Sequence, residues 1–568
     1  MVSSVPFDIL AAPEVAIQQV FDQHSQSSED FSNVLSNHFK DIFCREERLS
    51  LIPRLESTFS RVESSMTGGK TAESSLQIVQ FRGMVQDTSA SPELYLSRLS
   101  GGKYGGWGAH ETMDGRGDVD YANLRECTRY WVVSIPGQTQ WAGNSSSQGA
   151  APLNSAQNAY KFPLPSTPHI GLSVNVYSAQ ADVDLKSTDI VTFVGLFESE
   201  SNTLHVLFHL HESAVQEDHR AYPLALEVGE NLEDQVQTLR SELVSWIADE
   251  SLAGDRDAAE WVLLSVISRV QSRNPPIMPA SLTLARFPPP VDSSTVALSE
   301  STSTSSDSDT GKSSPSNNIP TLYSILSLLV PIITHVPLSL PLLNDGVFVP
   351  ESKPRPRTDD ADDPEDELHS GILQLAPSTV CLITDSGITE GRINDRGVRS
   401  LRALQDVIRN QTLEYVFPYS GFRFETDIGC IVCTEGKHSA FVETHVTVPL
   451  KPALSLSSSQ LQQRLYKSSA EIDLPPAEKL QAWRKLIGGG IGVSDAASDY
   501  IQEEFQRRKN PQQTDGKSKG ITTPDDLIHR MLMTKLLALS MHEPEVTVEI
   551  WERMKDLEKR RLARVAAV

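Results

Sequence analysis

Cysteine is scarce in this chain of 568 residues, which has five: Cys44, Cys127, Cys381, Cys430 and Cys433. So few cysteines exclude a disulfide scaffold and are typical of a reducing compartment. Basic residues are also outnumbered: the chain has 50 Lys and Arg but 74 Asp and Glu, which gives a formal net charge of −24. A protein that coats DNA or an anionic membrane needs clustered basic surface, so this balance argues against both classes and favours protein partners.

Long unbroken hydrophobic segments are missing as well. Residues 313–344 carry no charge, but Pro331, Pro337 and Pro341 would each break a helix there. We therefore predict a buried helix that ends near Pro331 and is followed by an irregular segment, and no membrane span. The first twelve residues have no basic start and include Pro6 and Asp8, so we expect no signal peptide.

Low-complexity sequence suggests where the domains lie. Residues 291–318 are mostly Ser, Thr, Asp and Asn, with too few large apolar side chains to offset the entropy of ordering. We predict a disordered linker that separates two halves. The full prediction is an N-terminal helical region (1–75), a β-rich OB-like domain (76–215), a helical region (216–290), the linker (291–318), an α/β core (319–470) and a helical, lid-like C-terminal region (471–568).

The first half is predicted to be β-rich and then helical. Strands with β-branched and aromatic residues between turn signals are predicted at 76–86, 130–135, 172–177, 190–197 and 204–211. Strands of this length, separated by Gly-rich loops, are typical of a small barrel such as an OB-fold. Helical patterns follow at 239–247 and 258–270.

The second half alternates between helix and strand, which indicates an α/β core. Helices are predicted at 321–329 and 397–409, and strands at 379–384 and 428–434. Three helices are predicted in the tail, beginning near 475, 524 and 547. The second is expected to bury one apolar face, and the third to end in a basic tip that stays outside the core. These residues are Ile528, Leu532, Leu536 and Leu539 on the face, and Lys559, Arg560, Arg561 and Arg564 at the tip.

Two short motifs end like a phosphate loop, around Lys70 and Lys312. The full motif needs a further glycine five residues before the one that precedes the lysine, and those positions hold Ser64 and Ser306. An apolar strand also ends in Asp385, where an ATPase could hold Mg²⁺, but without a phosphate loop we interpret it as a capped strand end. We therefore predict no ATP hydrolysis and no cofactor.

Two patterns could suggest a metal site. His205, His209 and His211 would share one face of a regular strand, with Val206, Phe208 and Leu210 on the other, and we interpret them as a polar outer face. Cys430 and Cys433 have C-x-x-C spacing but lie in an apolar run without a second pair, which favours buried structural thiols. We predict no structural zinc. No nucleophile-and-base motif is present, so the residues alone indicate a multidomain, acidic, non-catalytic intracellular protein.

A series of segments, taken in order, resembles the mini-chromosome maintenance (MCM) complex-binding protein family. They are residues 81–87, 125–137 with Trp141, 182–197, 204–209, 335–352, 368–376 and 522–560. Each is weak alone, but the ordered set is specific. The resemblance implies a nuclear protein that binds MCM helicase subunits, promotes MCM unloading from chromatin, and supports replication and sister-chromatid cohesion.

The resemblance also implies a degenerate MCM/AAA+-like α/β core in the second half, which we expect to be the main docking surface. Residues 371–385 resemble the MCM stretch that leads into Walker B, and Thr384 and Asp385 fall where the helicase has its Asp-Glu pair. Association with chromatin is expected through MCM, with no direct sequence-specific nucleic-acid binding and no membrane partner. The alternative is an active AAA+-type ATPase or an OB-fold DNA-binding replication factor.

Overall fold

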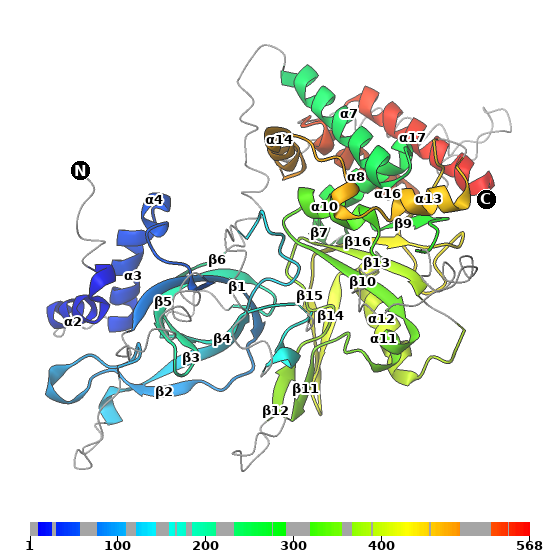
Figure 1. The fold of residues 1–568 in the computed structure, drawn as a ribbon. Coiled ribbons are helices and arrows are strands. Elements are labelled where there is room, and N and C mark those ends of the chain that lie inside the picture. Colours follow the sequence, from blue (N-terminus) through cyan, green and yellow to red (C-terminus); the bar gives the residue numbers. More distant parts are fainter. Residues whose placement is uncertain are drawn as a thin grey trace, which may run out of the picture.

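The computed structural model describes the chain in two modules that lie side by side, a β-barrel with N-terminal helices and an α/β module (Figure 1). The described residues are 9–24, 30–56, 76–109, 121–143, 158–164, 167–177, 185–211, 232–274, 276–290, 318–354, 366–387, 390–453, 456–488, 524–543 and 545–567. No helix among them is both long and apolar enough to cross a membrane.

Five strands close into the barrel, at nearly the positions that the sequence predicts. They are β1 (Gln77–Asp87), β3 (Leu124–Val133), β4 (Gly171–Val176), β5 (Ile190–Glu198) and β6 (Thr203–His211). The ring runs β1-β3-β4-β6-β5 and back to β1; the β4–β6 pair is parallel and the others are antiparallel. The barrel is compatible with the OB-like expectation. A short strand, β2 (Glu93–Leu96), extends the sheet beside β3.

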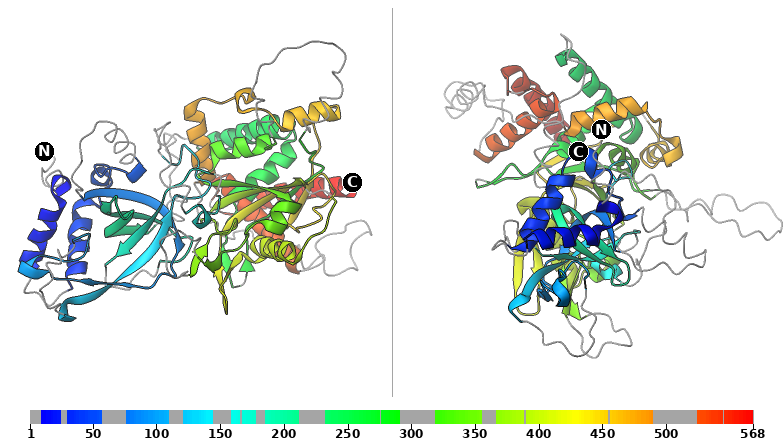
Figure 2. Two further views of the ribbon diagram at one scale, coloured as in Figure 1. Left: turned by 60° about the horizontal axis from the view of Figure 1, so that its bottom comes forward. Right: turned by 90° about the vertical axis from the view of Figure 1, so that its left-hand side faces the viewer.

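Helices α2 (Pro13–His24), α3 (Phe31–Phe43) and α4 (Glu46–Leu49) pack on the barrel, on the side away from the α/β module (Figures 1 and 2). Asp30 caps the start of α3, where its side chain accepts a hydrogen bond from the Ser32 backbone N–H. Its buried residues Leu35, Phe39 and Phe43 recur every four positions and form one face against the outside of β6.

The α/β module is built on a parallel sheet in the order β10-β13-β16-β9-β17. The strands are β9 (Leu282–Ala285), β10 (Ile333–Ser339), β13 (Thr379–Gly387), β16 (Ile428–Cys433) and β17 (Val446–Pro449). Alternate residues of β13 face opposite sides, so Leu382 joins the core under one helical layer and Ile383 the core under the other. Both faces are therefore covered, as parallel sheets require.

One helical layer contains α7 (Leu232–Ser251), α8 (Arg256–Ile267) and α10 (Thr321–Leu329), with α13 (Ser458–Leu465), α14 (Ala477–Gly488), α16 (Pro524–Ser540) and α17 (Val548–Ala567) around them. The other layer contains α11 (Leu340–Asp345) and α12 (Asp395–Asn410), which Figure 1 shows below the sheet. A small second sheet has the order β12-β11-β14-β15. Its strands are β11 (Glu351–Pro354), β12 (Asp366–His369), β14 (Thr412–Val416) and β15 (Gly421–Glu425); a separate ribbon pairs β7 (Ser272–Arg273) with β8 (Pro276–Ile277).

The division of the chain predicted at residues 291–318 is wrong, whereas the disorder predicted for that segment concerns residues that, up to 317, lie outside the described part of the chain. Strand β9 precedes that segment, yet it pairs with β16 and β17 inside the sheet. Leu243 of α7 and Leu322 of α10, on either side of the segment, share one hydrophobic core that extends to Leu557 of α17. The helical region predicted at 216–290, the core at 319–470 and the C-terminal region are thus one folded unit, and the segment is an insertion in it.

The irregular segment predicted after Pro331 is also corrected. Residues Ile333–Ser339 form β10, which pairs with β13 alone among the strands of the sheet. Pro337 lacks a backbone N–H, and an edge strand tolerates such a residue because one side of it needs no partner.

The burial of two regions of the C-terminal helices differs from the sequence prediction: one apolar residue of α16 is exposed, and part of the basic tip of α17 is buried. Leu532 and Leu536 of α16 are buried, whereas Ile528 is 53% exposed. Only part of the basic tip stays outside the core: Lys559 and Arg560 are exposed, whereas Arg561 and Arg564 are partly buried. Arg564 of α17 binds Asp255 and Asp257 at the start of α8. The tip thus fastens α17 to the module instead of offering a free basic patch.

Candidate functional site

In open α/β sheets, ligands bind outside the carboxyl ends of the strands. In this sheet that edge gathers the carboxyl ends of β9, β13 and β16: Ala285 ends β9, Thr434 follows β16, and Asp385 lies in β13 two residues before its last residue, Gly387. A nucleotide site of the phosphate-loop type would place its glycine-rich loop directly after one of these strands. The edge is therefore the place to ask which chemistry the module can perform.

The segment that leaves β9 fills this edge with its own backbone. The N–H of Arg286 donates to the Gly436 carbonyl (3.1 Å), and the N–H of Phe287 donates to the Thr434 carbonyl (2.8 Å). Residues 288–290 are prolines and have no N–H to offer. A phosphate loop binds through a row of free backbone N–H groups, and residues 286–290 supply none.

Side chains fix the same segment in place. The Phe287 ring is 2% exposed and packs edge-on against Tyr466, with ring centroids 6.0 Å apart. The Tyr466 hydroxyl donates to the Pro288 carbonyl (3.0 Å), and Gln462 Nε2 donates to the Pro289 carbonyl (3.1 Å). Because Phe287 is a core residue, the segment cannot swing away without opening the core.

At the end of β13, Thr384 and Asp385 occupy the positions that the sequence analysis singled out. The Thr384 hydroxyl lies 3.1 Å from His335 Nε2, and burial lowers the pKa of His335 to about 4. Burial raises the pKa of Asp385, partly offset by hydrogen bonds from Thr434 and Ser439. These contacts hold both side chains against the protein, but β13 continues to Gly387, so the strand does not end at Asp385 as the sequence analysis expected. The two phosphate-loop-like motifs, around Lys70 and Lys312, lie outside the described residues.

The three histidines of β6 do not share a face, contrary to the sequence expectation. Opposite Val194 and Gly195 the register slips by one residue, leaving Leu207 as a bulge. His205 Nδ1 lies 2.7 Å from the Tyr177 hydroxyl, the His209 ring lies tilted beside the Phe193 ring, and His211 pairs with Asp189 at 3.0 Å. Within the described part of the chain, no group of three or more His, Cys, Asp or Glu side chains is placed to hold a metal ion.

Cys430 and Cys433 lie on β16 and are both buried. Three residues apart on a strand, they face opposite sides: Cys430 joins the core with α12, and Cys433 joins the core with α8. Desolvation raises the pKa of both thiols. They cannot ligate one ion together.

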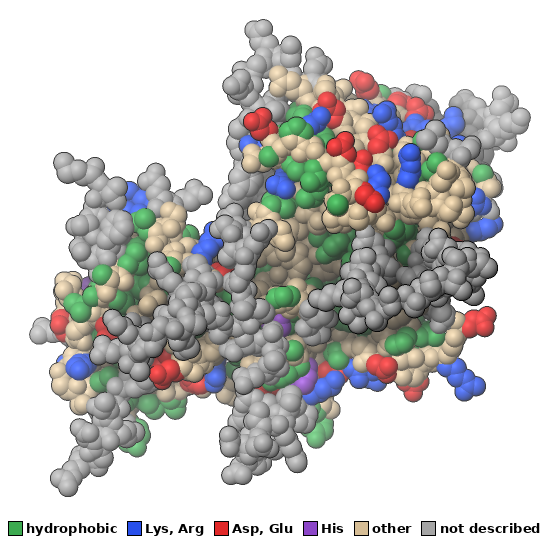
Figure 3. Space-filling model, viewed as in Figure 1, with side chains coloured by type: hydrophobic (Ala, Val, Ile, Leu, Met, Phe, Trp, Pro, Cys, Tyr) green, Lys and Arg blue, Asp and Glu red, His purple; other side chains and the backbone are tan. Residues whose placement is uncertain are grey.

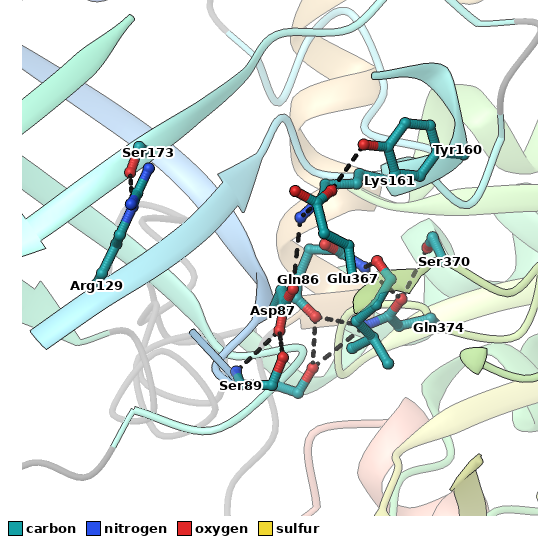
Figure 4. A network of polar contacts seen from close by, with 12 residues as sticks. Gln86, Asp87, Ser89, Arg129, Tyr160, Lys161, Ser173, Glu367, Ser370 and Gln374 are labelled. Atoms are coloured by element: carbon teal, nitrogen blue, oxygen red, sulfur yellow. Dashed lines mark hydrogen bonds and ion pairs between the residues drawn. The ribbon is translucent and has the colours of Figure 1, made fainter. Parts of the chain in front are cut away.

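Sequence reasoning missed the polar network that joins the two modules (Figure 4). Lys161 Nζ lies 3.5 Å from the Asp87 carboxylate of the barrel and 3.3 Å from the Glu367 carboxylate of β12. Gln374 donates to the Gln86 carbonyl (2.7 Å) and to the Tyr415 hydroxyl (2.7 Å). These buried contacts fix the barrel relative to the α/β module. No local pattern could reveal them, because Gln86 and Gln374 are 288 residues apart.

Comparison with known proteins places these features in context. A family model described as "Mini-chromosome maintenance replisome factor" matches residues 203–565. The Mini-chromosome maintenance complex-binding protein of Gallus gallus is 27% identical over 341 residues, 59% of this chain and 46% of that protein. The human protein of that name is 26% identical over 336 residues, 58% of this chain and 45% of that protein. The Arabidopsis thaliana protein of that name is 21% identical over 644 aligned positions, 97% of this chain and 96% of that protein. With the animal relatives, the match spans about half of their length.

Proposed function

The chain belongs to the family of mini-chromosome maintenance replisome factors, and from that premise we propose that it binds subunits of the replicative MCM helicase without catalysing a reaction. The names of its relatives, which describe MCM complex-binding proteins, support the partner. The carboxyl edge of the parallel sheet supports the absence of nucleotide chemistry. The backbone N–H groups of Arg286 and Phe287 donate to carbonyls of the protein itself, and the three prolines that follow have no N–H with which to bind phosphate.

We propose further that the α/β module is a degenerate AAA+-like core. Numbered along the chain, β9, β10, β13, β16 and β17 lie in the order 5-1-4-3-2. AAA+ ATPases order their parallel core strands in the same way, so the analogy of fold supports the relationship. On this alignment the phosphate loop would follow β9, at Arg286 and Phe287, and the Walker B acids would lie near the end of β13, at Thr384 and Asp385.

Subunit mimicry gives a physical route to MCM unloading. MCM subunits stand side by side in a ring, and nucleotide bridges neighbours. A relative that keeps the α/β frame could take a neighbour's place without completing an ATPase site, which would weaken ring closure. Binding energy alone then shifts the population toward open complexes. We propose that the protein acts in this way in the nucleus, reaches chromatin through MCM, and thereby supports replication and cohesion.

The charge distribution supports this proposal over the DNA-binding alternative. On the face shown in Figure 3, acidic and basic side chains are interspersed over the helical layer at the top, without one broad basic area among the described residues. On the barrel, the Arg129 guanidinium already pairs with Glu93, and Arg125 donates to the backbone carbonyls of Ala122 and Leu124. A protein that follows a phosphate backbone needs such cations unpaired and clustered.

We propose that the β14–β15 hairpin takes part in docking. Tyr419 at its tip is fully exposed and Phe422 is 66% exposed, while β15 is the last strand of its sheet and, among the described residues, pairs on one side only, with β14. Aromatic side chains of this kind supply much of the affinity of protein interfaces. A protein that kept them in water without a partner would risk aggregation.

The experiment is capture of MCM subunits from nuclease-treated nuclear extract by the full chain. We expect capture without added nucleotide, unchanged by Asp385→Asn. The double variant Tyr419→Ala/Phe422→Ala should capture less, and Tyr121→Ala, a matched exposed tyrosine on the barrel (78% exposed), should capture normally. A strict requirement for ATP, or loss on Asp385→Asn in a folded protein, would contradict the non-enzymatic function. Equal capture by the hairpin variant would contradict only the docking assignment.

A further inference from the structure

A cavity of about 410 Å³ lies where the barrel meets the α/β module, near the amino ends of β10 and β13. Its walls come from elements far apart in the chain: the Trp141 loop of the barrel module, the turn before β10, α14 and α16. Several walls are apolar, with Ile332, Leu536 and Leu539 among the lining residues. Ligand sites form preferentially at such domain junctions, where an apolar surface carries a few polar groups.

The charged residues that line the cavity all have one sign. They are Arg82 of β1, Arg269 after α8, and Arg484 and Lys485 of α14; none of the lining residues is Asp or Glu. In a chain with a net charge of −24, four cations around one apolar cavity are a local reversal of the overall charge. Arg269 already donates to the backbone carbonyls of Val266 and Ser268, so Arg484 and Lys485 are the two cations that most favour an anionic ligand here.

Arg484 is the cation of the cavity that is best placed to bind an anionic group. Its Nε donates to the Leu328 carbonyl (2.7 Å), and its guanidinium lies 4.0 Å from the centroid of the Trp141 ring. Both partners are neutral, and desolvation lowers the pKa of Arg484 below its ordinary value. A carbonyl and a ring only partly compensate a desolvated cation, whereas a carboxylate would form a charge-assisted, two-pronged bond with the guanidinium.

We propose that this cavity binds a short acidic peptide segment of a partner protein. One apolar side chain of the peptide lies against Leu536 and Leu539, and carboxylates on either side of it pair with Arg484 and Lys485. The proposal does not require the partner to be an MCM subunit. Nucleic acid fits less well: one face of Trp141 already carries Arg484, and the apolar wall at Leu536 and Leu539 suits an apolar side chain, which a sugar–phosphate backbone lacks.

The test uses the full chain and a fluorescein-labelled synthetic peptide in which a Leu-Phe pair is flanked by two acidic residues on each side, read by fluorescence anisotropy. We expect Lys485→Glu to weaken binding about tenfold, because it places a like charge beside the peptide carboxylates. Arg484→Gln should weaken it by a similar factor. The matched control is Arg402→Glu, an exposed arginine of α12 on the other side of the sheet, which should bind as the parent does.

Two further measurements separate the contribution of charge from that of apolar contact. Binding should fall between about 0.1 M and about 1 M salt, where the Debye length shrinks from about 10 Å to about 3 Å. A peptide with the acids replaced by serine, and one with the Leu-Phe pair replaced by serine, should both bind weakly.

Each of the following would overturn the proposal: no binding of the acidic peptide, equal binding by Lys485→Glu, or tighter binding of an oligothymidine that Lys485→Glu abolishes. If Arg484→Gln lowers the thermal unfolding midpoint, the binding by Lys485→Glu alone tests the proposal. The Lys485 side chain is partly exposed, so its substitution should leave the fold intact.

Discussion

Substitution of Arg564 should destabilise the packing of the C-terminal helix α17 against the α/β module. Arg564 of α17 meets Asp255 in a two-pronged pair, with Nη1–Oδ2 at 2.7 Å and Nη2–Oδ1 at 3.0 Å, and it reaches Asp257 at 2.8 Å. The Asp255 side chain is 1% exposed. It also caps α8 by accepting from the Ala258 N–H, and it accepts from the Lys451 N–H after β17. One carboxylate thus joins α8, α17 and the edge of the sheet.

The expected magnitude follows from burial. Removing one member of a buried ion pair costs about 3–5 kcal/mol, because the other charge stays buried without compensation. Asp255 would keep two backbone donors, so we expect Arg564→Ala to lower the free energy of unfolding of the α/β module by about 3 kcal/mol. Arg564→Lys keeps the charge but loses the planar fork, and should cost about 1–2 kcal/mol.

Urea unfolding followed by tryptophan fluorescence measures the effect, since Trp261 of α8 and Trp551 of α17 are both buried nearby. The control is Arg560→Ala on the same helix, whose side chain is 53% exposed and pairs with Asp257. It should cost less than about 1 kcal/mol. A double-mutant cycle with Asp255→Asn should give a coupling energy of at least about 1 kcal/mol. If Arg564→Ala changed stability no more than Arg560→Ala does, the basic tip would be a solvated surface after all.

Three further predictions follow from particular groups. Burial lowers the pKa of His335 to about 4 from 6.5, so the unfolded chain takes up the proton first and stability falls as pH drops below about 6.5, by about 2 kcal/mol at pH 5. His335→Gln should remove that part of the pH slope in urea unfolding, and an unchanged slope would count against it. In native protein at neutral pH, a thiol reagent should label the exposed Cys44 and spare Cys381 and Cys430, which are buried, with all reacting in denaturant; rapid native labelling of Cys430 would disprove its burial. A protease site introduced within residues 291–317 should yield two pieces that co-elute in gel filtration, because β9 stays paired with β16 and β17; separation of the pieces without denaturant would restore the two-half division.

Much of the fold could be read from the sequence because most elements carry their own local pattern. The barrel strands alternate or are rich in β-branched residues, and α10 and α12 show helical spacing with clear ends. Strand β9 could not be found in this way. It has four residues, all buried, and its place in the sheet depends on pairing with β16 and β17 from much later in the chain. Without β9, the composition of residues 291–318 predicted a domain boundary, although this segment is an insertion within one module.

The candidate site could be predicted only in part. Strand pattern located Thr384 and Asp385 near a strand end, but nothing in the sequence showed that Arg286 and Phe287 fill the same edge. The face of His205 could not be predicted either, since a one-residue bulge at Leu207 changes the alternation. Long-range geometry also decides the cavity beside Arg484, which needs both modules in place.

The central claim is that the protein binds MCM subunits with a core that uses no nucleotide. It is tested most directly by isothermal titration of the purified full chain with purified MCM subunits, with and without ATP, alongside titration of ATP into the chain alone. We predict MCM binding of equal affinity in both conditions and no heat from ATP alone, because the edge that would hold the phosphates is closed by residues 286–290. Stoichiometric ATP binding by the chain, lost on Asp385→Ala, would contradict the account.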